Sequence, residues 1–392
     1  MPAKGVNRVS ASPSDRVHSC DVAVVGGGVI GLAIGWRAAL RGLTVTVIDE
    51  PHRARASYHA AGMLAPVTEV HYGEEDLLRL NLESAQHYPA FVAELEEASG
   101  TSVGYRPTGT LAVAFDDDDK AVLDELHQYQ KALGLASQSL TARECRELEP
   151  FLATRVRGGL LVDGDHQVDN RRLIEALRTA CERVGVAFWN CSARDIVVEG
   201  DEVIGADSVR AARTVLAAGC WSASIIGLPE HARPPVRPVK GQIVRLRDNS
   251  RRPILSRNVR AFVHGRPIYL VPRADGEIVL GATSEEKGFD PTLTVEGTGD
   301  LLADARELVP RVGEIELVEV TAGLRPGSPD NAPMIGAGAL PGLVVATGHY
   351  RNGILLAPVT ADAIAELLAT GDMPAGFERF DPCRFAHAAM PV

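Results

Sequence analysis

The residue types and spacing with the clearest chemical meaning lie near the N-terminus, in the segment Gly26-Gly27-Gly28-Val29-Ile30-Gly31. Gly26 permits a tight turn, Gly28 lets the backbone approach a pyrophosphate, and Gly31 lets a helix pack closely on a strand. The N–H groups and dipole at the start of that helix hold phosphate charge. Asp49 closes the next apolar run and would accept hydrogen bonds from the adenosine ribose. These features predict a dinucleotide-binding βαβ unit, with a glycine-rich turn that binds no ligand as the alternative.

Two further residues have the chemistry to hold an acidic substrate. Arg325 lies between apolar residues in the segment Ala322-Gly323-Leu324-Arg325-Pro326-Gly327. An unpaired guanidinium is costly to bury, and its planar fork matches a carboxylate, so the segment predicts a carboxylate anchor. The alternative is an internal salt bridge. Tyr269 is either a donor to the same carboxylate or a buried tyrosine whose hydroxyl is satisfied elsewhere.

Two segments have the small residues and turn chemistry to enclose a flat cofactor. The small residues in 57–64 would let the backbone pass against an aromatic ring, with Met63 as the wall of a small pocket. The same stretch reads equally well as a helix start packed in the core. The segment 348–355 is a second turn into a helix, whose N–H groups would serve another polar part of the cofactor. His349 and Arg351 there either line the site or support it from behind.

The elements that must position these groups alternate between strand-like and helix-like runs, which predicts an α/β architecture. We expect a discontinuous Rossmann-like domain formed by 21–80, 155–233 and 323–380. A second, mainly antiparallel-sheet substrate domain would comprise 81–154 and 234–322, with 1–20 as a disordered leader and 381–392 as a tail. Local signals predict a capping box at 141–144, a helix capped by Asp169, a strand at 203–209, and helices starting at Trp221 and Gly353.

The composition narrows the class of protein. The 392 residues are 45% hydrophobic and 23% charged, which is typical of a globular chain with a full core. The net charge of −11 disfavours a nucleic-acid partner, and no run approaches the roughly 20 apolar residues that span a membrane. The six cysteines show no Cys-x-x-Cys spacing, so we expect reduced thiols, no metal and a cytoplasmic protein.

Five segments together resemble the D-amino-acid oxidase superfamily of flavoproteins, and within it most closely the glycine oxidases linked to thiamine biosynthesis. The resemblance runs from Asp21 to about Phe380. The stretches that carry it are Ala60-Ala61-Gly62-Met63-Leu64, Pro238-Val239-Lys240-Gly241, Tyr269-Leu270-Val271-Pro272-Arg273, Ala322-Gly323-Leu324-Arg325-Pro326-Gly327 and Gly348-His349-Tyr350-Arg351-Asn352-Gly353-Ile354-Leu355-Leu356-Ala357-Pro358. No single stretch suffices, and chance agreement of all five is implausible.

The resemblance implies FAD, bound non-covalently, with its ADP half on the first βαβ unit and its ring between the two domains. The residues matched to the adenosine half are Val29, Ile30, Asp49 and Glu50, with Gly26, Gly28, Gly31 and Gly219 near the cofactor and Arg194 touching adenine through its backbone. Those matched to the flavin are Ala61, Gly62 and Met63 beside the ring, and His349, Tyr350, Arg351, Asn352, Gly353, Ile354 and Leu355 at its end. Arg325 matches the arginine that grips the substrate carboxylate, with Tyr269, Arg351 and Met63 beside it.

The implied reaction is oxidative deamination of glycine. The carboxylate is held, the neutral amine leaves the Cα–H aimed at the flavin, and a hydride is transferred without a side-chain general base. Oxygen then yields hydrogen peroxide, and the imine either hydrolyses to glyoxylate and ammonia or feeds thiazole synthesis. The implied partners are a small amino acid and oxygen, in a protein expected to be a homo-oligomer.

Three residues depart from this pattern or leave a choice open. Ser284 stands where relatives often have methionine, which leaves sarcosine and small D-amino acids as alternative substrates of an oxidase or dehydrogenase. His59 precedes the ring segment, where other members of the superfamily attach flavin covalently. Lys240 either influences the reaction with oxygen or is a surface lysine after a turn. A non-catalytic flavin-binding protein and, more distantly, an NAD-dependent dehydrogenase are the alternatives from other classes.

Overall fold

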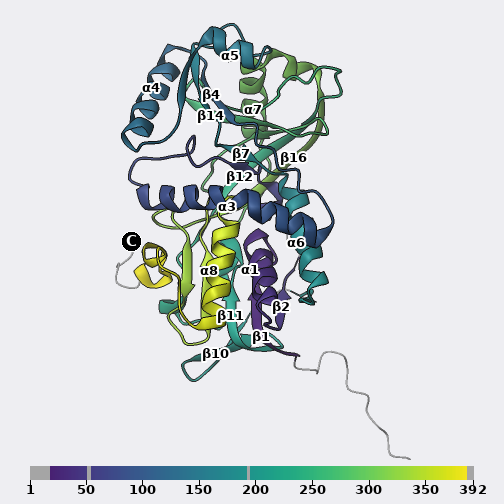
Figure 1. The fold of residues 1–392 in the computed structure, drawn as a ribbon, viewed down its shortest axis with the longest axis vertical. Helices are drawn as coiled ribbons and strands as arrows, with labels where there is room; N and C mark the ends of the chain where they lie inside the picture. The colour runs from purple at the N-terminus through teal and green to yellow at the C-terminus, as the bar shows by residue number, and fades with distance from the viewer. Residues whose placement is uncertain (1–17, 51–53, 192–194, 386–392) are drawn as a thin grey trace, which may run out of the picture.

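The computed structural model describes residues 18–50, 54–191 and 195–385, which form two large sheets with their covering helices (Figure 1). Helix α3 (Glu75–Ser99) crosses the molecule between the half that contains the first sheet and the half that contains the second. The mixed α/β architecture predicted from the alternating runs is confirmed.

The first sheet has the strand order β17-β18-β11-β1-β2-β8, with β1 at its centre. Strand β1 pairs in parallel with β11 and β2, and residues 22–25 are almost completely buried. Such continuous β-branched apolar runs are typical of parallel strands that are covered on both faces. The strands are β1 (His18–Val25), β2 (Val45–Ile48), β8 (Ala187–Trp189), β11 (Val209–Leu216), β17 (Met334–Ala337) and β18 (Leu343–Thr347), with β9 (Ile196–Glu199) and β10 (Glu202–Ala206) as an antiparallel extension.

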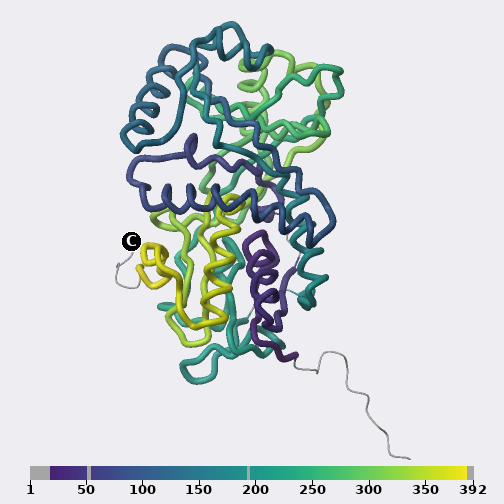
Figure 2. Tube along the Cα trace, viewed as in Figure 1, coloured from purple at the N-terminus to yellow at the C-terminus, as the bar shows by residue number. Residues whose placement is uncertain are grey.

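Helices from both ends of the chain cover this sheet. Helix α1 (Val29–Leu40) packs against α8 (Ala357–Thr370) and α6 (Asn170–Arg183). Figure 2 shows the N-terminal α1 and the C-terminal α8 side by side. Nine of the twelve residues of α1 are buried, because it is covered by neighbours on more than one side.

The second sheet has the order β16-β12-β15-β14-β13-β4-β6-β5, and every pairing is antiparallel except that of β13 with β4. Its strands are β4 (Thr110–Ala114), β5 (Gln138–Thr141), β6 (Gly158–Val162), β12 (Arg237–Arg247), β13 (Asn258–Val263), β14 (Arg266–Pro272), β15 (Glu277–Gly281) and β16 (Glu316–Gly327). The associated helices are α4 (Asp117–Ala132), α5 (Ala142–Leu148) and α7 (Val295–Leu308). Helix α2 (Ala56–His59) and the short pair β3 (Met63–Leu64) and β7 (His166–Gln167) complete the elements that surround the site.

The sheet pairings change several of the expected assignments. Residues 158–162 and 323–327, which we assigned to the first domain, pair within the second sheet as β6 and the end of β16. The apolar face of α3, of which residues 81–99 were assigned to the second domain, packs into the core formed with α1, α6 and α8. Periodicity identifies an apolar face but not the partner that covers it, which is why it did not indicate these pairings. The exact domain boundaries stay a prediction.

The chain ends also differ from expectation. Residues 18–20 belong to β1 rather than to a leader, because they pair with Val209, Arg210 and Ala211. In the expected tail, a short 3-10 helix (Pro382–Phe385) packs on β17, and Arg384 pairs with Asp330. Residues 1–17 and 386–392 lie outside the described residues.

Local capping signals were reliable, whereas some element limits were not. The capping box of Thr141 and Glu144 is present, and the Asp169 side chain caps α6. The strand expected at 203–209 is wrong, because Asp207 adopts a φ of 48° and separates β10 from β11. The helix expected after Trp221 is a 3-10 helix at Gly219–Ser224, and α8 begins at Ala357 rather than Gly353. Across 18–50, 54–191 and 195–385, no helix is both long and apolar enough to cross a membrane.

Candidate active site

A cavity of about 440 Å³ extends from the glycine-rich turn of the first sheet to the inner face of the second. This volume lies within the range of small-molecule sites, roughly 300–1,000 Å³. The predicted cofactor residues that line it are Gly26, Gly28, Val29, Ile30, Asp49, Glu50, Ala61, Gly62, Met63, Gly219, His349, Tyr350, Arg351, Gly353 and Ile354. Gly31, Asn352 and Leu355 are absent from its lining, and Arg194 lies outside the described residues. Most of the residues singled out from the sequence therefore line one cavity, and their contacts with the cofactor stay a prediction.

The glycine-rich turn has the geometry that a pyrophosphate requires. Gly26 has a φ of 107°, and a Cβ on Gly31 would lie 1.9 Å from the carbonyl oxygen of Gly26. Helix α1 therefore starts in direct contact with the turn, as its close packing on β1 demands. The N–H groups of Gly28 and Ile30 have no acceptor among the described residues. They are available to phosphate oxygens, which suits a dinucleotide.

Asp49 stands at the end of β2, where the adenosine half of a dinucleotide would lie. Its carboxylate accepts the Gly27 N–H at 2.8 Å and forms an ion pair with Arg55 at 2.6 Å. Arg55 also donates to the Glu50 carbonyl oxygen at 2.6 Å and lines the cavity. Sequence reasoning missed Arg55, because an isolated arginine in a loop carries no spacing signal. The hydrogen bond from ribose to Asp49 stays a prediction.

The loop 349–356 is held from behind by α3. The Tyr88 hydroxyl donates to the Ile354 carbonyl at 3.2 Å, and the Ser84 hydroxyl donates to that of Leu355 at 2.5 Å. The N–H groups of Arg351, Gly353 and Ile354 have no acceptor among the described residues, and all three residues line the cavity. The loop therefore has several amide donors without an acceptor at the cavity wall, and their contact with the cofactor stays a prediction.

His349 supports this loop rather than acting as an acid or base. The side chain is buried, its Nε2 lies 3.1 Å from the Thr360 hydroxyl, and burial lowers its pKa to about 3. The imidazole is therefore neutral at physiological pH. Of the two interpretations left open by the sequence, this geometry favours the supporting one.

Arg325 and Tyr269 meet on the cavity wall formed by the second sheet. No carboxylate lies within 4.0 Å of Arg325 in the described part of the chain, so the internal salt bridge is not found. Its Nη1 instead donates to the Thr283 carbonyl at 3.1 Å. Removal from water raises the pKa of Tyr269, and the neighbouring Arg325 partly opposes that shift. The arrangement leaves an arginine with donors to spare beside a neutral phenol.

Glycines make room for both side chains. A Cβ on Gly241 would lie 2.3–2.5 Å from the guanidinium atoms of Arg325, and one on Gly281 would lie 2.3 Å from the Tyr269 hydroxyl. A small apolar cluster contains Ala61, Met63, Ile243, Tyr269, Val271, Val279 and Ala282, and all of these except Val271 and Val279 line the cavity. The guanidinium and the phenol hydroxyl thus lie beside an apolar part of the wall.

Charged pairs that the sequence did not indicate surround the same end of the cavity. Arg351 pairs with Glu74, and Arg260 pairs with Glu69. Arg260 lies directly opposite Tyr269 in the β13–β14 ladder. Both arginines therefore have acidic partners, whereas Arg325 has none among the described residues.

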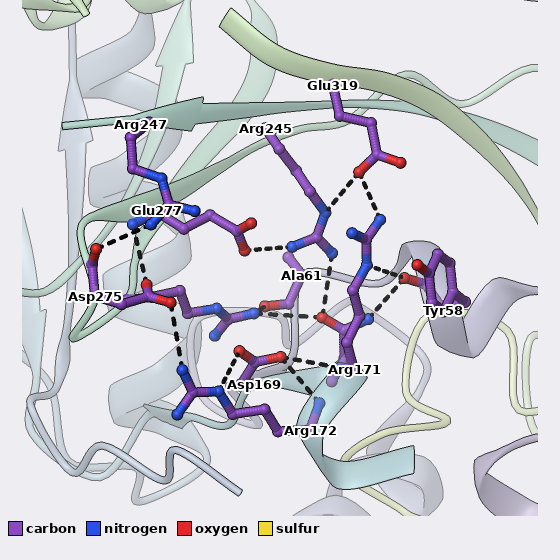
Figure 3. A network of polar contacts seen from close by, with 12 residues as sticks. Tyr58, Ala61, Asp169, Arg171, Arg172, Arg245, Arg247, Asp275, Glu277 and Glu319 are labelled. Atoms are coloured by element: carbon purple, nitrogen blue, oxygen red, sulfur yellow. Dashed lines mark hydrogen bonds and ion pairs between the residues drawn. The ribbon is translucent and has the colours of Figure 1, made fainter. Parts of the chain in front are cut away.

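A buried polar network fixes the segment expected to border the flavin ring. Arg273 donates to the carbonyl oxygens of Ala61 at 2.6 Å and Val168 at 2.8 Å, and Asn170 donates to those of Ser57 and Tyr58. Figure 3 shows how this network continues through Arg245 to Glu277 and Glu319, and how Glu319 also pairs with Arg171. The network joins α6 and the second sheet to the segment 57–62.

The structure corrects the interpretation of Lys240 and leaves the role of His59 undecided. Lys240 is not a surface lysine, because only 1% of it is exposed and its Nζ lies 2.8 Å from Glu285. It is also absent from the cavity lining, which removes the basis for a direct influence on oxygen. His59 is buried at the cavity wall, close to Gly323. A covalent flavin link there stays an untested minor alternative.

Comparison with known proteins agrees with this geometry. Residues 21–367 match the family described as DAO, FAD dependent oxidoreductase. The chain belongs to this family. The family is described by its use of FAD, and the cavity offers amide donors for such a cofactor at the glycine-rich turn and at the loop 349–356.

The relatives narrow the comparison further. The chain is 37% identical over 355 residues to the bifunctional protein ThiO/ThiG of Nostoc sp., covering 89% of the chain but 52% of that protein. It thus spans about half the length of the first curated relatives it matches. Glycine oxidase of Geobacillus kaustophilus is 34% identical, with 90% of this chain and 93% of that protein covered. The crystal structure of glycine oxidase from that organism superposes with a TM-score of 0.86 at 33% identity, covering 94% and 99% of the two chains.

Proposed function

We propose that the chain is a glycine oxidase, which oxidises glycine to its imine and reduces oxygen to hydrogen peroxide. Water then hydrolyses the imine to glyoxylate and ammonia. The observation that carries the proposal is Arg325, a guanidinium without a carboxylate partner in the described residues, on an apolar wall beside the segment 61–63. The similarity to proteins named glycine oxidase, with nearly full coverage of both chains, supports the same activity.

The residues of the chain suit each task of this reaction. Arg325 would hold the substrate carboxylate bidentately, and the Tyr269 hydroxyl would donate to it from the side. Met63 and Ile243 would exclude water from the Cα–H, in the apolar wall described above. FAD, when bound, supplies the hydride acceptor and the route of electrons to oxygen. No side-chain general base is required, because an amine that binds neutral leaves only the Cα–H bond to break.

The cofactor contacts belong to the same proposal. Asp49 and the N–H groups of the glycine-rich turn would hold the ADP half, and the loop 349–354 would hold the flavin end. The cavity offers amide donors and a carboxylate at the first position and further amide donors at the second. We propose non-covalent binding and a homo-oligomeric, cytoplasmic enzyme.

A related substrate is the second candidate. Ala282 and Ser284 are small side chains on the cavity wall, which leaves space for a substituent on the amine or on Cα. Sarcosine and D-alanine are therefore the compounds to compare with glycine. In addition, the fused relatives named ThiO/ThiG support a role in supplying the imine to thiazole synthesis for thiamine.

Product analysis tests the proposal. FAD-loaded protein is incubated aerobically with glycine, sarcosine or D-alanine, and peroxide, ammonia and oxoacid are measured. Glycine oxidation predicts equal amounts of peroxide, ammonia and glyoxylate, with the highest kcat/KM for glycine. A higher kcat/KM for sarcosine would move the assignment to an oxidase of N-methyl amino acids, with glyoxylate and methylamine as the products of oxidation at Cα, or formaldehyde and glycine as those of oxidation at the methyl group. Turnover only with an artificial acceptor would make the protein a dehydrogenase.

A further inference from the structure

Three consecutive residues of β12 lie behind the substrate arginine: Lys240, Gly241 and Gln242. Side chains alternate across a strand, so the outer two face one side of the sheet while the glycine faces the other. Gly241 lies against the guanidinium of Arg325. Lys240 and Gln242 are 1% and 0% exposed, so both polar side chains are buried on the opposite face.

Glu285 joins the two buried side chains. One oxygen of its carboxylate lies 2.8 Å from the Lys240 Nζ, and the other accepts the Gln242 Nε2–H at 2.9 Å and the Thr283 hydroxyl at 2.6 Å. The backbones of Lys240 and Glu285 also exchange two hydrogen bonds of 2.9 Å. Burial opposes ionisation of Glu285, but the hydrogen bonds from these partners outweigh it, and its pKa lies below the ordinary value.

Thr283 joins the hydrogen bonds of Glu285 to those of Arg325. The Thr283 hydroxyl is held both by Glu285 and by the Gln242 N–H, the latter at 2.8 Å. The carbonyl of the same residue accepts Arg325 Nη1–H at 3.1 Å, and the Lys240 carbonyl approaches Nη1 at 3.5 Å. Both acceptors of the guanidinium are therefore backbone atoms whose residues are attached to Glu285.

We propose that Glu285 is a positioning residue for Arg325. Ionised and tied to Lys240, it fixes the Thr283 carbonyl, and this carbonyl sets the orientation in which the guanidinium presents its remaining N–H groups to a carboxylate. Carbonyl acceptors hold the arginine without neutralising it, whereas an acidic partner would compete with the substrate. The inference rests on the proposed function, because it takes Arg325 as the substrate anchor.

The substitution Glu285→Gln tests this role with little change in volume. Glu286→Gln is the matched control, because its carboxylate is exposed and pairs with Arg237 at the surface. Three measurements are made on FAD-loaded protein: the Kd of acetate from the flavin absorption change, KM and kcat for glycine, and the rate of flavin reduction by ethylamine. Acetate carries the carboxylate without the amine, and ethylamine carries the amine without the carboxylate.

The proposal predicts that Glu285→Gln raises the Kd of acetate and the KM of glycine about tenfold, the scale of one weakened charge-assisted hydrogen bond. Meanwhile kcat at saturating glycine and reduction by ethylamine stay within about twofold of the parent, and Glu286→Gln changes none of them. Thr283→Val, which keeps the carbonyl but removes the hydroxyl that Glu285 holds, predicts the same pattern. If Glu285→Gln fails to fold, the results for Thr283→Val decide whether the contact between Glu285 and Thr283 positions Arg325.

Two results overturn the proposal. Acetate and glycine binding in Glu285→Gln equal to that of Glu286→Gln would show that the carboxylate does not position Arg325. Loss of ethylamine reduction in parallel with glycine oxidation would show a general structural defect. Failure of the proposed function is distinguishable, because the parent protein itself would then not oxidise glycine, whatever Glu285→Gln does to the binding of acetate.

Discussion

Gly241→Ala is the change whose effect follows most directly from the geometry of the site. A Cβ at this position would lie 2.3 Å from Arg325 Nη2 and 2.5 Å from its Cζ and Nη1. Ordinary van der Waals contact begins near 3.4 Å, so the guanidinium would have to retreat by about 1 Å. Its hydrogen bond of 3.1 Å to the Thr283 carbonyl would then exceed the usual limit of about 3.5 Å.

The size of the effect can be worked from this displacement. Hydrogen bonds that involve a charged group contribute about 1.5–3 kcal/mol, and 1.4 kcal/mol corresponds to about tenfold in an equilibrium constant. We therefore expect Gly241→Ala to lower kcat/KM for glycine by about 10- to 100-fold. The absorption spectrum of bound FAD should not change, because Gly241 lies at the substrate end of the cavity.

The assay is initial-rate peroxide release from FAD-loaded protein over a range of glycine concentrations. Gly299→Ala is the matched control, because nothing lies within 4 Å of its Cβ position and alanine suits the helix α7. The control should keep the parent kcat/KM. The reasoning is refuted if Gly241→Ala also keeps kcat/KM within about twofold, because the guanidinium would then not occupy the assigned position.

The remaining predictions concern the cofactor, the anchor and pH. Asp49→Ala should raise the Kd of FAD at least about tenfold in fluorescence titrations, because it removes the ribose acceptor and the partner of Arg55; an unchanged Kd would contradict the assignment. Arg325→Ala should raise the glycine KM far more than Arg273→Ala, and equal KM values would refute the anchor. The main effect of Arg273→Ala should be a loss of about 3 kcal/mol of unfolding free energy, since Arg273 is a buried donor to the Ala61 carbonyl. Burial depresses the pKa of His349 to about 3, so the unfolded chain binds more protons between pH 6.5 and 3, and stability falls as the pH falls through that window. Relative to His349→Gln, the parent should lose about 1 kcal/mol of unfolding free energy between pH 7.5 and 5.5 in urea titrations, and identical pH profiles would count against a buried neutral imidazole.

The sequence predicted the parts of the structure that depend on local patterns. The βαβ unit combines a buried strand, a glycine turn and a helix within a few dozen residues, and its close contact of Gly31 with Gly26 is present. The capping box at Thr141 and the Asp169 cap also depend on neighbours only three or fewer positions away. Such local signals leave little freedom to the chain.

What the sequence did not predict depends on contacts between distant residues. Lys240 was interpreted as exposed, because Glu285, its buried partner, follows 45 positions later. The ion pair of Arg260 with Glu69, 191 positions away, likewise has no sequence motif that indicates it. The sequence singled out Arg325 as a candidate anchor. Its neighbours Gly241 and Thr283 become visible only when β16 and the segment of Thr283 are placed beside β12.

Anaerobic reduction of the bound flavin by glycine tests the central claim most directly. The parent protein and Arg325→Met are loaded with FAD, mixed with glycine without oxygen, and followed by flavin absorbance before air is admitted. The account predicts rapid bleaching of the parent by glycine and recovery of colour in air with release of peroxide. For Arg325→Met it predicts that the absorption spectrum of the oxidised flavin is unchanged and that a far higher glycine concentration is needed to reduce it. A parent flavin that glycine does not reduce, or equal bleaching of both proteins, would contradict it.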